Sequence, residues 1–466
     1  MEQRIHIIDT PNHVGKEVEL AGWVDVRRDH GKLIFIDLRD ESGVVQMVVP
    51  PDNKDLHDTA DQVRTEWVIG VQGLVKERPA KMKNDKLPTG GVEIEVKGIT
   101  ILNSAETPVF ELAGDGYEVS EEVRLKYRYL DLRRARLQHN IRLRSKLVDS
   151  IRQYLFAKSF VEIETPYLTK ATAEGSRDFL VPSRLQQGQF YALPQSPQQY
   201  KQLIMASGFE RYFQIARCFR DEDLRADRGF EHTQLDVEMS FVKQEDVLDI
   251  IEGTMIEVAH KLGKKIKETP FPRFTYAEAM EKFGADKFDL RTEEDKKDGT
   301  LAFAWVTRFP FFEHTDGGGW TFTHNPFSNT VPEHREKLLA GEIESIIADQ
   351  YDLVLNGYEA GGGSIRAHEP EVLKKVLGVM GFDDEKIKRE YGHMLEAFRR
   401  GTPPHGGIAL GIDRLTMCFA GETALREVQA FPMTAGGKTA VMDAPTDVSP
   451  EQLLEFGIQI KKKPAA

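Results

Sequence analysis

The sequence has little cysteine and no long apolar run. Among its 466 residues only Cys218 and Cys418 are cysteines, and two thiols build neither a disulfide framework nor a four-cysteine zinc site. Both lie in apolar stretches, which predicts buried, unreactive thiols. No stretch approaches the roughly 18 consecutive apolar residues of a membrane span, and the N-terminus lacks a basic segment followed by an apolar core. We therefore expect a cytoplasmic protein that makes no use of membranes.

An excess of positive charge is also missing. The chain has 62 Lys and Arg against 75 Asp and Glu, for a formal net charge of -13. Proteins that coat nucleic acid regardless of sequence need a broadly basic surface, so this class is disfavoured, although a local basic face on an acidic body is not. The Gly-x4-Gly-Lys-Ser/Thr loop is absent as well, which excludes a P-loop nucleotide site.

Residues 1–103 are predicted to form short β-strands. Apolar, β-branched runs alternate there with turn-rich segments at 28–31, 40–43 and 87–91. Five closely spaced strands in about 100 residues predict a small closed barrel of the OB type, which commonly binds oligonucleotides.

The strand predicted over residues 33–39 has two different faces. Ile34, Ile36 and Leu38 fall on one side, which suits a barrel interior, so Phe35 falls on the outer side. The arginines close to it are Arg27, Arg28 and Arg39. An outward aromatic among arginines is typical of a surface on which single-stranded bases stack, and packing of Phe35 under a neighbouring loop is the alternative.

The rest of the chain has a different pattern. Residues 104–130 are polar and irregular and are predicted to be a hinge, and helical spacing of apolar residues begins near 141 within a long mixed region at 131–466. A charged bridge with almost no apolar residues, predicted to be a surface loop, spans 291–300, and the basic tail at 461–466 is predicted to fray. The sequence therefore predicts an α+β protein with an N-terminal barrel.

Arginines and acids recur inside three otherwise apolar, strand-like segments, at 213–228, 234–239 and 407–415. A guanidinium in such a setting needs an anionic partner, which internal carboxylates or a bound phosphate both supply. Asp236 and Glu238 are two residues apart, so they share a face of a strand and repel each other unless a cation lies between them. Oxygen ligands facing phosphates suit Mg²⁺. The pattern indicates a nucleotide held by arginines and Mg²⁺.

These segments resemble the motifs of class II aminoacyl-tRNA synthetases. The run 220–222 with Arg228 and Glu231 resembles motif 2, the run 411–414 resembles motif 3, and the run 161–166 resembles motif 1, whose proline lies at a dimer interface. Longer runs resemble the bacterial type of aspartyl-tRNA synthetase and follow its order through nearly the whole chain. They are residues 22–24, 27–31, 35–40, 169–172, 195–198, 217–228, 356–359 and 361–366.

The resemblance implies a fold and a division of the chain. Residues 1–103 would be an OB-fold anticodon-binding domain, 104–130 a hinge, and 131–466 a class II catalytic domain built on an antiparallel sheet flanked by helices. The implied activity is that of an aspartate–tRNA ligase, which uses ATP and Mg²⁺ to activate L-aspartate and transfers it to tRNA(Asp), as a homodimer.

The resemblance also implies roles for individual residues. Arg220 would bridge the ATP α-phosphate and the amino acid carboxylate, and Arg414 would hold the γ-phosphate, so these two are the expected catalytic residues. The aspartate site would comprise Glu174, Gln198, Lys201, Arg220, His324 and Arg366. The ATP site would comprise Arg220, Asp221, Glu222, His232, Glu359, Gly411, Ile412, Asp413 and Arg414. The Mg²⁺ ligands or their neighbours would be Asp236, Glu238, Asp352 and Glu359. The anticodon readers would be Arg28, His30, Phe35, Gln46 and Glu93.

The chain departs from the family pattern in four places. His232 stands where a phenylalanine usually stacks on adenine, and an imidazole is expected to stack more weakly and with a pH dependence. Gly229 replaces a glutamine that contacts ATP, and Asn325 replaces a second histidine. Bacterial members carry an insertion of about 100 residues, one ordinary domain, where this chain has the bridge at 291–300.

Three alternatives share parts of this pattern: an asparaginyl- or lysyl-tRNA synthetase, a synthetase-like paralogue that acts without tRNA, and a plain RNA-binding module. Lys201 with Arg366 favours an anionic side chain, because two cations facing a carboxylate form a charge-assisted site that an amide leaves unpaired. The barrel disfavours the paralogue, and the phosphate-binding pattern disfavours the RNA-binding module. His30 and the loop at 78–90 favour a relaxed enzyme that also charges tRNA(Asn).

Overall fold

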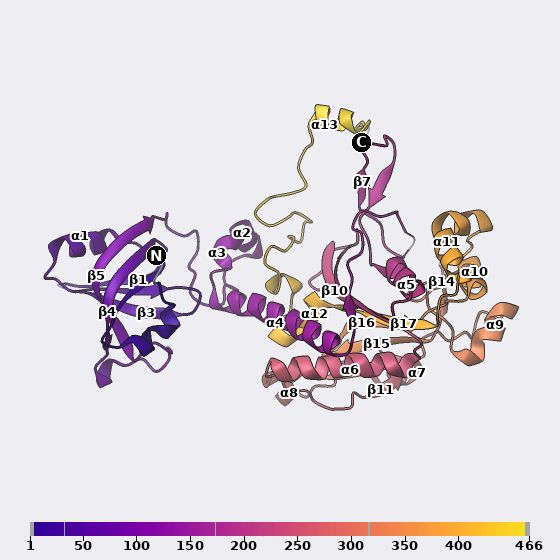
Figure 1. Cartoon of the computed structure of the whole chain (residues 1–466), viewed down its shortest axis with the longest axis horizontal. Coiled ribbons are helices and arrows are strands. Elements are labelled where there is room, and N and C mark those ends of the chain that lie inside the picture. Colours follow the sequence, from indigo (N-terminus) through magenta and orange to yellow (C-terminus); the bar gives the residue numbers. More distant parts are fainter. Residues whose placement is uncertain (1–3, 32, 173, 316, 462–466) are drawn as a thin grey trace. The chain divides into compact units, whose positions relative to one another are not determined.

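Figure 1 shows a computed structural model of the chain, which describes residues 4–31, 33–172, 174–315 and 317–461. The chain divides into two compact units, residues 1–113 and 114–466. No helix within the described ranges is both long enough and apolar enough to cross a membrane.

The first unit is a closed five-stranded barrel, as predicted, with the strand order β1-β2-β3-β5-β4. The strands are β1 (Glu17–His30), β2 (Leu33–Arg39), β3 (Val44–Val49), β4 (Val68–Glu77) and β5 (Val92–Asn103). A short helix, α1 (Lys54–Gln62), begins after Asn53, whose side chain accepts a hydrogen bond from the Leu56 amide. The 3-10 turns η1 (Ile7–His13) and η2 (Ala80–Met82) complete the unit.

The alternation in β2 determines which side chains face outward. Ile34, Ile36 and Leu38 are fully buried inside the barrel, whereas Phe35 is only partly buried on the outer face. The predicted orientation of Phe35 is confirmed. Its ring meets the His30 ring edge to face, with the ring centres 5.5 Å apart.

The segment predicted to be an irregular hinge is partly helical. Its later residues belong to the second unit and form α2 (Glu121–Lys126) and α3 (Arg128–Asp131). The polar composition is misleading because these charges are paired in the interior. Arg128 is fully buried and donates to Asp131 at 2.8 Å, while buried Arg124 pairs with Glu427.

The second unit is built on an eight-stranded sheet with the order β11-β12-β15-β16-β17-β10-β9-β6. All its pairs are antiparallel except β11–β12 and β6–β9 at the two edges. The strands are β6 (Val161–Glu162), β9 (Arg211–Phe219), β10 (Glu231–Ser240), β11 (Arg273–Thr275), β12 (Phe303–Thr307), β15 (Gln350–Leu355), β16 (Tyr358–Ile365) and β17 (His405–Gly411).

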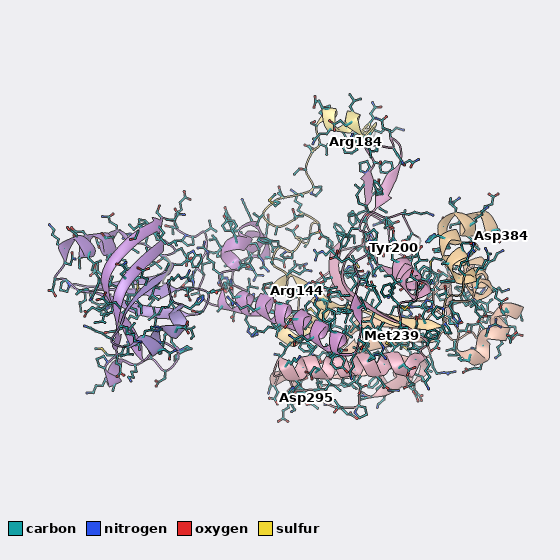
Figure 2. The ribbon with its side chains drawn as sticks, in the orientation of Figure 1. Arg144, Arg184, Tyr200, Met239, Asp295 and Asp384 are labelled. Atoms are coloured by element: carbon teal, nitrogen blue, oxygen red, sulfur yellow. The ribbon has the colours of Figure 1, made fainter. Side chains whose placement is uncertain are left out.

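Helices cover both faces of this sheet, and alternation along β10 separates the two faces. Leu235, Val237 and Met239 lie in the main core with α4 (Ala135–Ala157), α6 (Gln244–Lys261) and α12 (Ile412–Ala420), and Met239 is labelled in Figure 2. Asp236 and Glu238 lie on the other face, where α5 (Gln198–Ala206) packs. One face of the sheet therefore packs in the hydrophobic core, and the other face presents polar side chains.

The remaining elements surround the sheet. They are α7 (Tyr276–Phe283), α8 (Glu293–Lys297), α9 (Arg335–Ala340), α10 (Pro370–Val379), α11 (Asp384–Arg399), α13 (Pro450–Glu455), the turns η3 (Pro332–His334) and η4 (Leu425–Glu427), and the hairpins β7 (Leu180–Pro182) with β8 (Phe190–Ala192) and β13 (Phe312–His314) with β14 (Trp320–Phe322). The bridge at 291–300 is thus not a plain loop. It contains α8, which starts at a capping box made by Thr292 and Asp295. The tail at 462–466 lies outside the described residues.

Both cysteines are buried, as predicted. Burial raises the pKa of the Cys218 thiol well above its ordinary value and that of Cys418 to about 12, so neither forms a thiolate near neutral pH.

Candidate active site

A cleft of about 600 Å³ opens over the polar face of the sheet. Its walls come from α5, the loop between β9 and β10, the turn before β16, and the start of α12. Most of the residues expected in the aspartate and ATP sites line it. They are Glu174, Gln198, Lys201, Arg220, Glu222, His232, His324, Glu359, Arg366, Gly411, Asp413 and Arg414.

Glycines in β16 form one surface of this cleft. A Cβ at Gly361 would lie 2.1 Å from the Ala409 carbonyl oxygen, and one at Gly363 would lie 2.2 Å from the Gly407 carbonyl oxygen. A Cβ at Gly362 would lie 2.7 Å from Oδ1 of Asp352. Side chains at these positions are excluded by the neighbouring strand and by that carboxylate, so the cleft is lined by main chain here.

Two cations meet two carboxylates beside these glycines. Lys201 Nζ donates to Asp236 Oδ1 at 2.8 Å and lies 3.3 Å from Glu238 Oε2. Arg366 donates from Nε and Nη2 to the two Glu238 oxygens at 2.9 and 3.1 Å, and from Nη1 to Ser364 Oγ at 2.9 Å. Burial opposes the charge of Glu238, but Arg366 and Lys201 outweigh it and lower its pKa.

Asp236 and Glu238, expected to be Mg²⁺ ligands or their neighbours, are thus paired with protein cations in this structure. Alternation placed both carboxylates correctly on one face, but the cations between them are Lys201 and Arg366, and Gln234 Nε2 donates to the second Asp236 oxygen at 2.6 Å. Within the described ranges, no group of three or more His, Cys, Asp or Glu side chains is arranged to hold a metal ion. The two acids instead fix the position of the two cations.

Asp352 and Glu359 fit a divalent cation better. Asp352 is buried, and its Oδ2 has no hydrogen-bond partner among the described residues, although His324 Nε2 lies 3.4 Å away. Glu359 Oε1 faces the same space, 3.8 Å from a Cβ built at Gly362. Two nearby carboxylates, one with an unsatisfied oxygen, are suitable Mg²⁺ ligands.

The charges around this pair are unequal. Burial raises the pKa of Asp352, partly opposed by His324, whereas Lys287 and Arg414 outweigh burial and lower the pKa of Glu359. Lys287 Nζ lies 2.8 Å from Glu359 Oε2 and lines the cleft. Sequence reasoning did not single out Lys287, because it sits in an ordinary polar stretch with no motif around it.

Arg414 is partly satisfied. Its guanidinium donates to the Glu359 carbonyl oxygen and, at 3.3 Å, to the Asp227 carboxylate, but its buried Nε has no partner among the described residues. Arg220 follows β9, and its Nε donates to the Gln195 carbonyl oxygen at 3.4 Å, the one hydrogen bond of its side chain among the described residues. Two incompletely paired guanidinium groups facing one cleft suit a polyanionic ligand.

The loop between β9 and β10 carries a further pair in the cleft. Glu222 accepts from Ser176 Oγ and lies 3.0 Å from Arg228 Nη1. On the amino acid side, Glu174 Oε2 accepts from Ser196 Oγ at 2.9 Å, and burial raises the Glu174 pKa. Sequence reasoning did not assign roles to Asp227 or Ser196, which became visible only through these contacts.

Three residues expected in the ATP site have other partners. Asp221 pairs with Arg177 at 3.4 Å and does not line the cleft, and Ile412 is fully buried in the core. Asp413 touches the cleft, but its oxygens accept from Arg144 at 2.7 Å and from the Thr233 amide at 2.7 Å. Asp413 thus joins α4, α12 and β10.

His232, which was expected to stack on adenine, lines the cleft. Burial, reinforced by the nearby Arg220 cation, lowers the pKa of His232 to about 3. We therefore expect the imidazole to be neutral in the physiological range, so that its stacking on a base would not depend on pH there.

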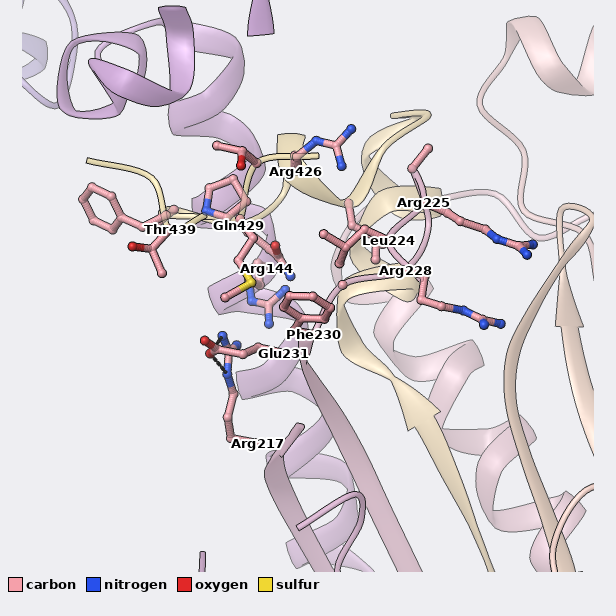
Figure 3. A pocket seen from close by; sticks show the side chains of 18 residues that line it. Arg144, Arg217, Leu224, Arg225, Arg228, Phe230, Glu231, Arg426, Gln429 and Thr439 are labelled. Carbon is pink, nitrogen blue, oxygen red and sulfur yellow. Dashed lines mark hydrogen bonds and ion pairs between the residues drawn. The ribbon is translucent and has the colours of Figure 1, made fainter. Parts of the chain in front are cut away.

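A second, smaller pocket of about 240 Å³ lies behind the same loop (Figure 3). It shares Arg225, Arg228 and Gly229 with the main cleft. Figure 3 shows Arg225 and Arg228 extending away from the ion pair of Arg217 with Glu231, whose closest atoms are 2.6 Å apart. The loop therefore separates two cavities and contributes side chains to both.

The five expected anticodon readers lie on one outer face of the barrel. Arg28 pairs with Phe35 in the register of β1 and β2, and its guanidinium holds both oxygens of Asp37 at 2.9 and 2.8 Å. On the adjoining strands, Gln46 Nε2 donates to Glu93 at 3.2 Å. A third group, Arg78, donates to Gln46 at 2.8 Å. The remaining residue expected to read the anticodon is His30, at the end of β1, against Phe35.

Comparisons with known proteins agree with both units. Residues 18–102 match the family described as OB-fold nucleic acid binding domain, and residues 120–435 match tRNA synthetases class II (D, K and N). An aspartate–tRNA(Asp/Asn) ligase of Rubrobacter xylanophilus is 40% identical over 574 aligned residues, covering 96% of this chain and 95% of that protein. An aspartate–tRNA ligase of Staphylococcus saprophyticus is also 40% identical, covering 97% and 98%.

Solved structures of lower identity share the fold. The asparaginyl-tRNA synthetase of Pyrococcus horikoshii, in complex with asparaginyl-adenylate, has a TM-score of 0.74 at 23% identity and covers 93% of this chain and 99% of its own. The aspartyl-tRNA synthetase of Entamoeba histolytica has a TM-score of 0.73 at 23% identity, covering 92% and 91%. With the barrel, the antiparallel sheet and the charged cleft in place, these matches mean that the chain belongs to the class II aminoacyl-tRNA synthetases, in the aspartyl-tRNA ligase family.

Proposed function

We propose that the protein is an aspartate–tRNA ligase. It activates L-aspartate with ATP to form aspartyl-adenylate and diphosphate, then transfers the aspartyl group to the 3′ end of tRNA(Asp). The observation that carries this proposal is the cation pair Lys201 and Arg366, which two buried carboxylates hold against one wall of the cleft. The full-length similarity to aspartate–tRNA ligases supports the same substrate.

Lys201 and Arg366 discriminate among amino acid side chains because both present only hydrogen-bond donors. An arginine has five N–H donors, and the three contacts of Arg366 leave part of this fork for a ligand; Lys201 also has only donors. A side-chain carboxylate accepts from both cations. The amide of asparagine turns an NH₂ group toward one of them, and the ammonium of lysine is repelled, so both should be rejected strongly.

Activation needs no general base. The α-carboxylate of aspartate attacks the α-phosphorus of ATP, one P–O bond forms, the bond to the β-phosphate oxygen breaks, and diphosphate leaves. Arg220 would hold the α-phosphate and the attacking carboxylate, and Arg414, with its unpaired Nε, the γ-phosphate. Positioning and charge stabilisation supply the rate enhancement. Mg²⁺, for which Asp352 and Glu359 are the proposed ligands, neutralises phosphate charge when bound.

The test is an aminoacylation assay with aspartate, asparagine and lysine. We expect charging with aspartate alone. Charging with asparagine or lysine would replace the substrate assignment, and pyrophosphate exchange without any tRNA charging would favour a paralogue that acts without tRNA.

A second candidate substrate is tRNA(Asn). Two of the similar proteins, from Rubrobacter xylanophilus and Syntrophomonas wolfei, are named as ligases for tRNA(Asp/Asn), and His30 is exposed beside the proposed anticodon stack. Comparing the aspartylation of purified tRNA(Asp) and tRNA(Asn) tests this. Comparable efficiencies support a relaxed enzyme, and a preference of several hundredfold for tRNA(Asp) would overturn it.

We also propose a cytoplasmic homodimer, based on the motif 1 run that ends at Pro166. Sedimentation at micromolar concentration should give twice the chain mass, and a stable monomer would contradict the assembly.

The alignment with the Rubrobacter ligase spans 574 residues, although this chain has 466, so that relative carries segments that are missing here. We place the missing insertion at the bridge that contains α8.

A further inference from the structure

A chain of hydrogen bonds runs from the cleft into the interior along one face of α5. Gln198 and Gln202 lie one helical turn apart, and Gln198 lines the cleft while Gln202 is fully buried. Gln198 Nε2 lies 3.1 Å from Gln202 Oε1, and Gln202 Nε2 lies 3.0 Å from Nε2 of His405. His405, at the start of β17, is also fully buried, and its Nδ1 lies 2.8 Å from the Pro403 carbonyl oxygen.

The last contact sets the direction of the whole chain. A carbonyl oxygen only accepts, so His405 Nδ1 carries the proton and donates to Pro403. Burial lowers the pKa of His405 to about 4, so the ring is neutral and Nε2 can only accept. Gln202 must therefore donate from its NH₂ group to His405. This orientation turns the Gln202 oxygen toward Gln198, which donates its own NH₂ group; among the described residues the Gln198 carbonyl oxygen then has no hydrogen-bond donor.

We propose that His405 and Gln202 are positioning residues that orient the Gln198 amide so that its oxygen, and not its NH₂ group, faces the α-ammonium of the amino acid substrate. The proposal rests on the proposed function, since it names the group that one of its binding residues presents.

The surroundings of Gln198 agree with this role. The main-chain N–H of Gln198 donates to Ser196 Oγ at 3.3 Å, and the same hydroxyl donates to the Glu174 carboxylate. A fixed carbonyl oxygen and a carboxylate on one side of the cleft form a subsite of acceptors, which suits an ammonium group. Lys201, one turn along α5 from the start of the helix, belongs instead to the donors that suit the side-chain carboxylate. The hydrogen-bond chain from His405 through Gln202 to Gln198, called the relay below, thus keeps acceptors at the ammonium end of the substrate, while donors face its side-chain carboxylate.

The experiment compares L-aspartate with succinate, which has both carboxylates but lacks the ammonium. Dissociation constants are measured by calorimetry for the wild type, Gln202→Met, His405→Phe and Gln198→Met. A hydrogen bond to a charged group corresponds to roughly 10- to 140-fold in affinity. Gln198→Met should weaken aspartate binding by about this much, and the two relay variants by a smaller factor, while succinate binding changes less than about 2-fold in all three.

Three controls separate the explanations. In the double variant Gln198→Met/Gln202→Met, the second change should add nothing, because both act through one contact. Thr254→Val removes a different buried hydroxyl, on α6, which donates to the Ile250 carbonyl oxygen, and it should leave both affinities unchanged. If His405→Phe does not fold, Gln202→Met carries the test.

Equal losses for aspartate and succinate in the relay variants would mean that His405 and Gln202 only support the fold, and unchanged aspartate affinity would also overturn the proposal. A wild-type protein that binds neither ligand would instead contradict the proposed function.

Discussion

Arg366 and Glu238 form a buried bidentate ion pair, with two parallel hydrogen bonds of 2.9 and 3.1 Å. Glu238 therefore fixes the plane of the guanidinium before any substrate arrives, and Lys201 closes the other side of the same carboxylate at 3.3 Å. Pre-oriented donors of this kind bind a carboxylate without losing side-chain freedom at the moment of binding.

We predict that Arg366→Gln or Lys201→Met abolishes aspartate activation and leaves ATP binding largely intact. Removing one partner of a desolvated charged contact costs about 2–5 kcal/mol, which is roughly 30- to 4000-fold in affinity. The measurement is pyrophosphate exchange at saturating ATP, together with ATP binding by calorimetry. An unchanged KM and rate for aspartate would contradict the assignment of the pocket.

Phe35→Ala should weaken tRNA charging and spare adenylate formation. Stacking on a base contributes about 1–3 kcal/mol, so the KM for tRNA should rise roughly 5- to 150-fold. Pyrophosphate exchange without tRNA should hardly change, because the cleft belongs to the other unit. Parallel loss of both activities would point to an unfolded protein, and loss of neither would place the anticodon reader elsewhere.

His232 should introduce no pH dependence into ATP binding near neutrality, because its pKa is lowered to about 3 and the ring is neutral at every pH above about 5. The KM for ATP, measured between about pH 5 and 8, should change in parallel for the wild type and His232→Phe. An inflection near the ordinary histidine pKa of about 6.5 in the wild type alone would show that the ring titrates in the accessible range.

Asp349→Asn should stabilise the protein at high pH only. Burial raises the pKa of Asp349 to about 6, so the folded state resists ionisation of this carboxyl. The loss of folding free energy is fully present above about pH 6, where the carboxyl is charged in both the folded and the unfolded state. It vanishes below the ordinary aspartate pKa of about 4, where the carboxyl is neutral in both states. Relative to the wild type, the free energy of unfolding of Asp349→Asn should be higher by on the order of 2–3 kcal/mol at pH 8 and unchanged at acid pH. Thermal unfolding at the two pH values is the measurement, and an equal gain at both would mean that charge is not the cause.

Lys287→Met should tighten Mg²⁺ binding to the protein without ATP. The Lys287 ammonium forms an ion pair with the Glu359 carboxylate at 2.8 Å and so competes with Mg²⁺ for it. Removing this half-exposed cation should lower the Mg²⁺ dissociation constant roughly 2- to 5-fold. A matched control is Lys296→Met on α8, which pairs with Glu293 and does not line the cleft. Mg²⁺ titration by calorimetry measures both, and weaker binding in Lys287→Met would contradict the competition.

The sequence predicts the barrel well because alternation is a local property. Burial of Ile34 and Ile36 and partial exposure of Phe35 follow from neighbouring residues alone. Alternation also places Asp236 and Glu238 on one face, yet it does not say which cations reach them. Lys201 and Arg366 arrive from α5 and from the end of β16, and only the fold brings them together.

Other parts of the site have no local signal. Buried Arg124 in α2 pairs with Glu427, about 300 residues further along the chain, so the local sequence alone predicts a polar hinge. Lys287 stands in a polar stretch, and its contact with Glu359 depends on where that stretch is placed. The low pKa of His232 likewise follows from burial, which a single residue in a sequence does not reveal.

The glycines of β16 limit how this enzyme can diverge. Because any side chain at Gly361 or Gly363 would collide with the main chain of β17, that surface of the cleft cannot be reshaped by point substitution. A change of amino acid preference must therefore be made on the other walls of the cleft, at side chains such as Gln198 and Lys201. This separates a main-chain surface, which point substitution leaves in place, from a small set of side chains that can change the choice of substrate.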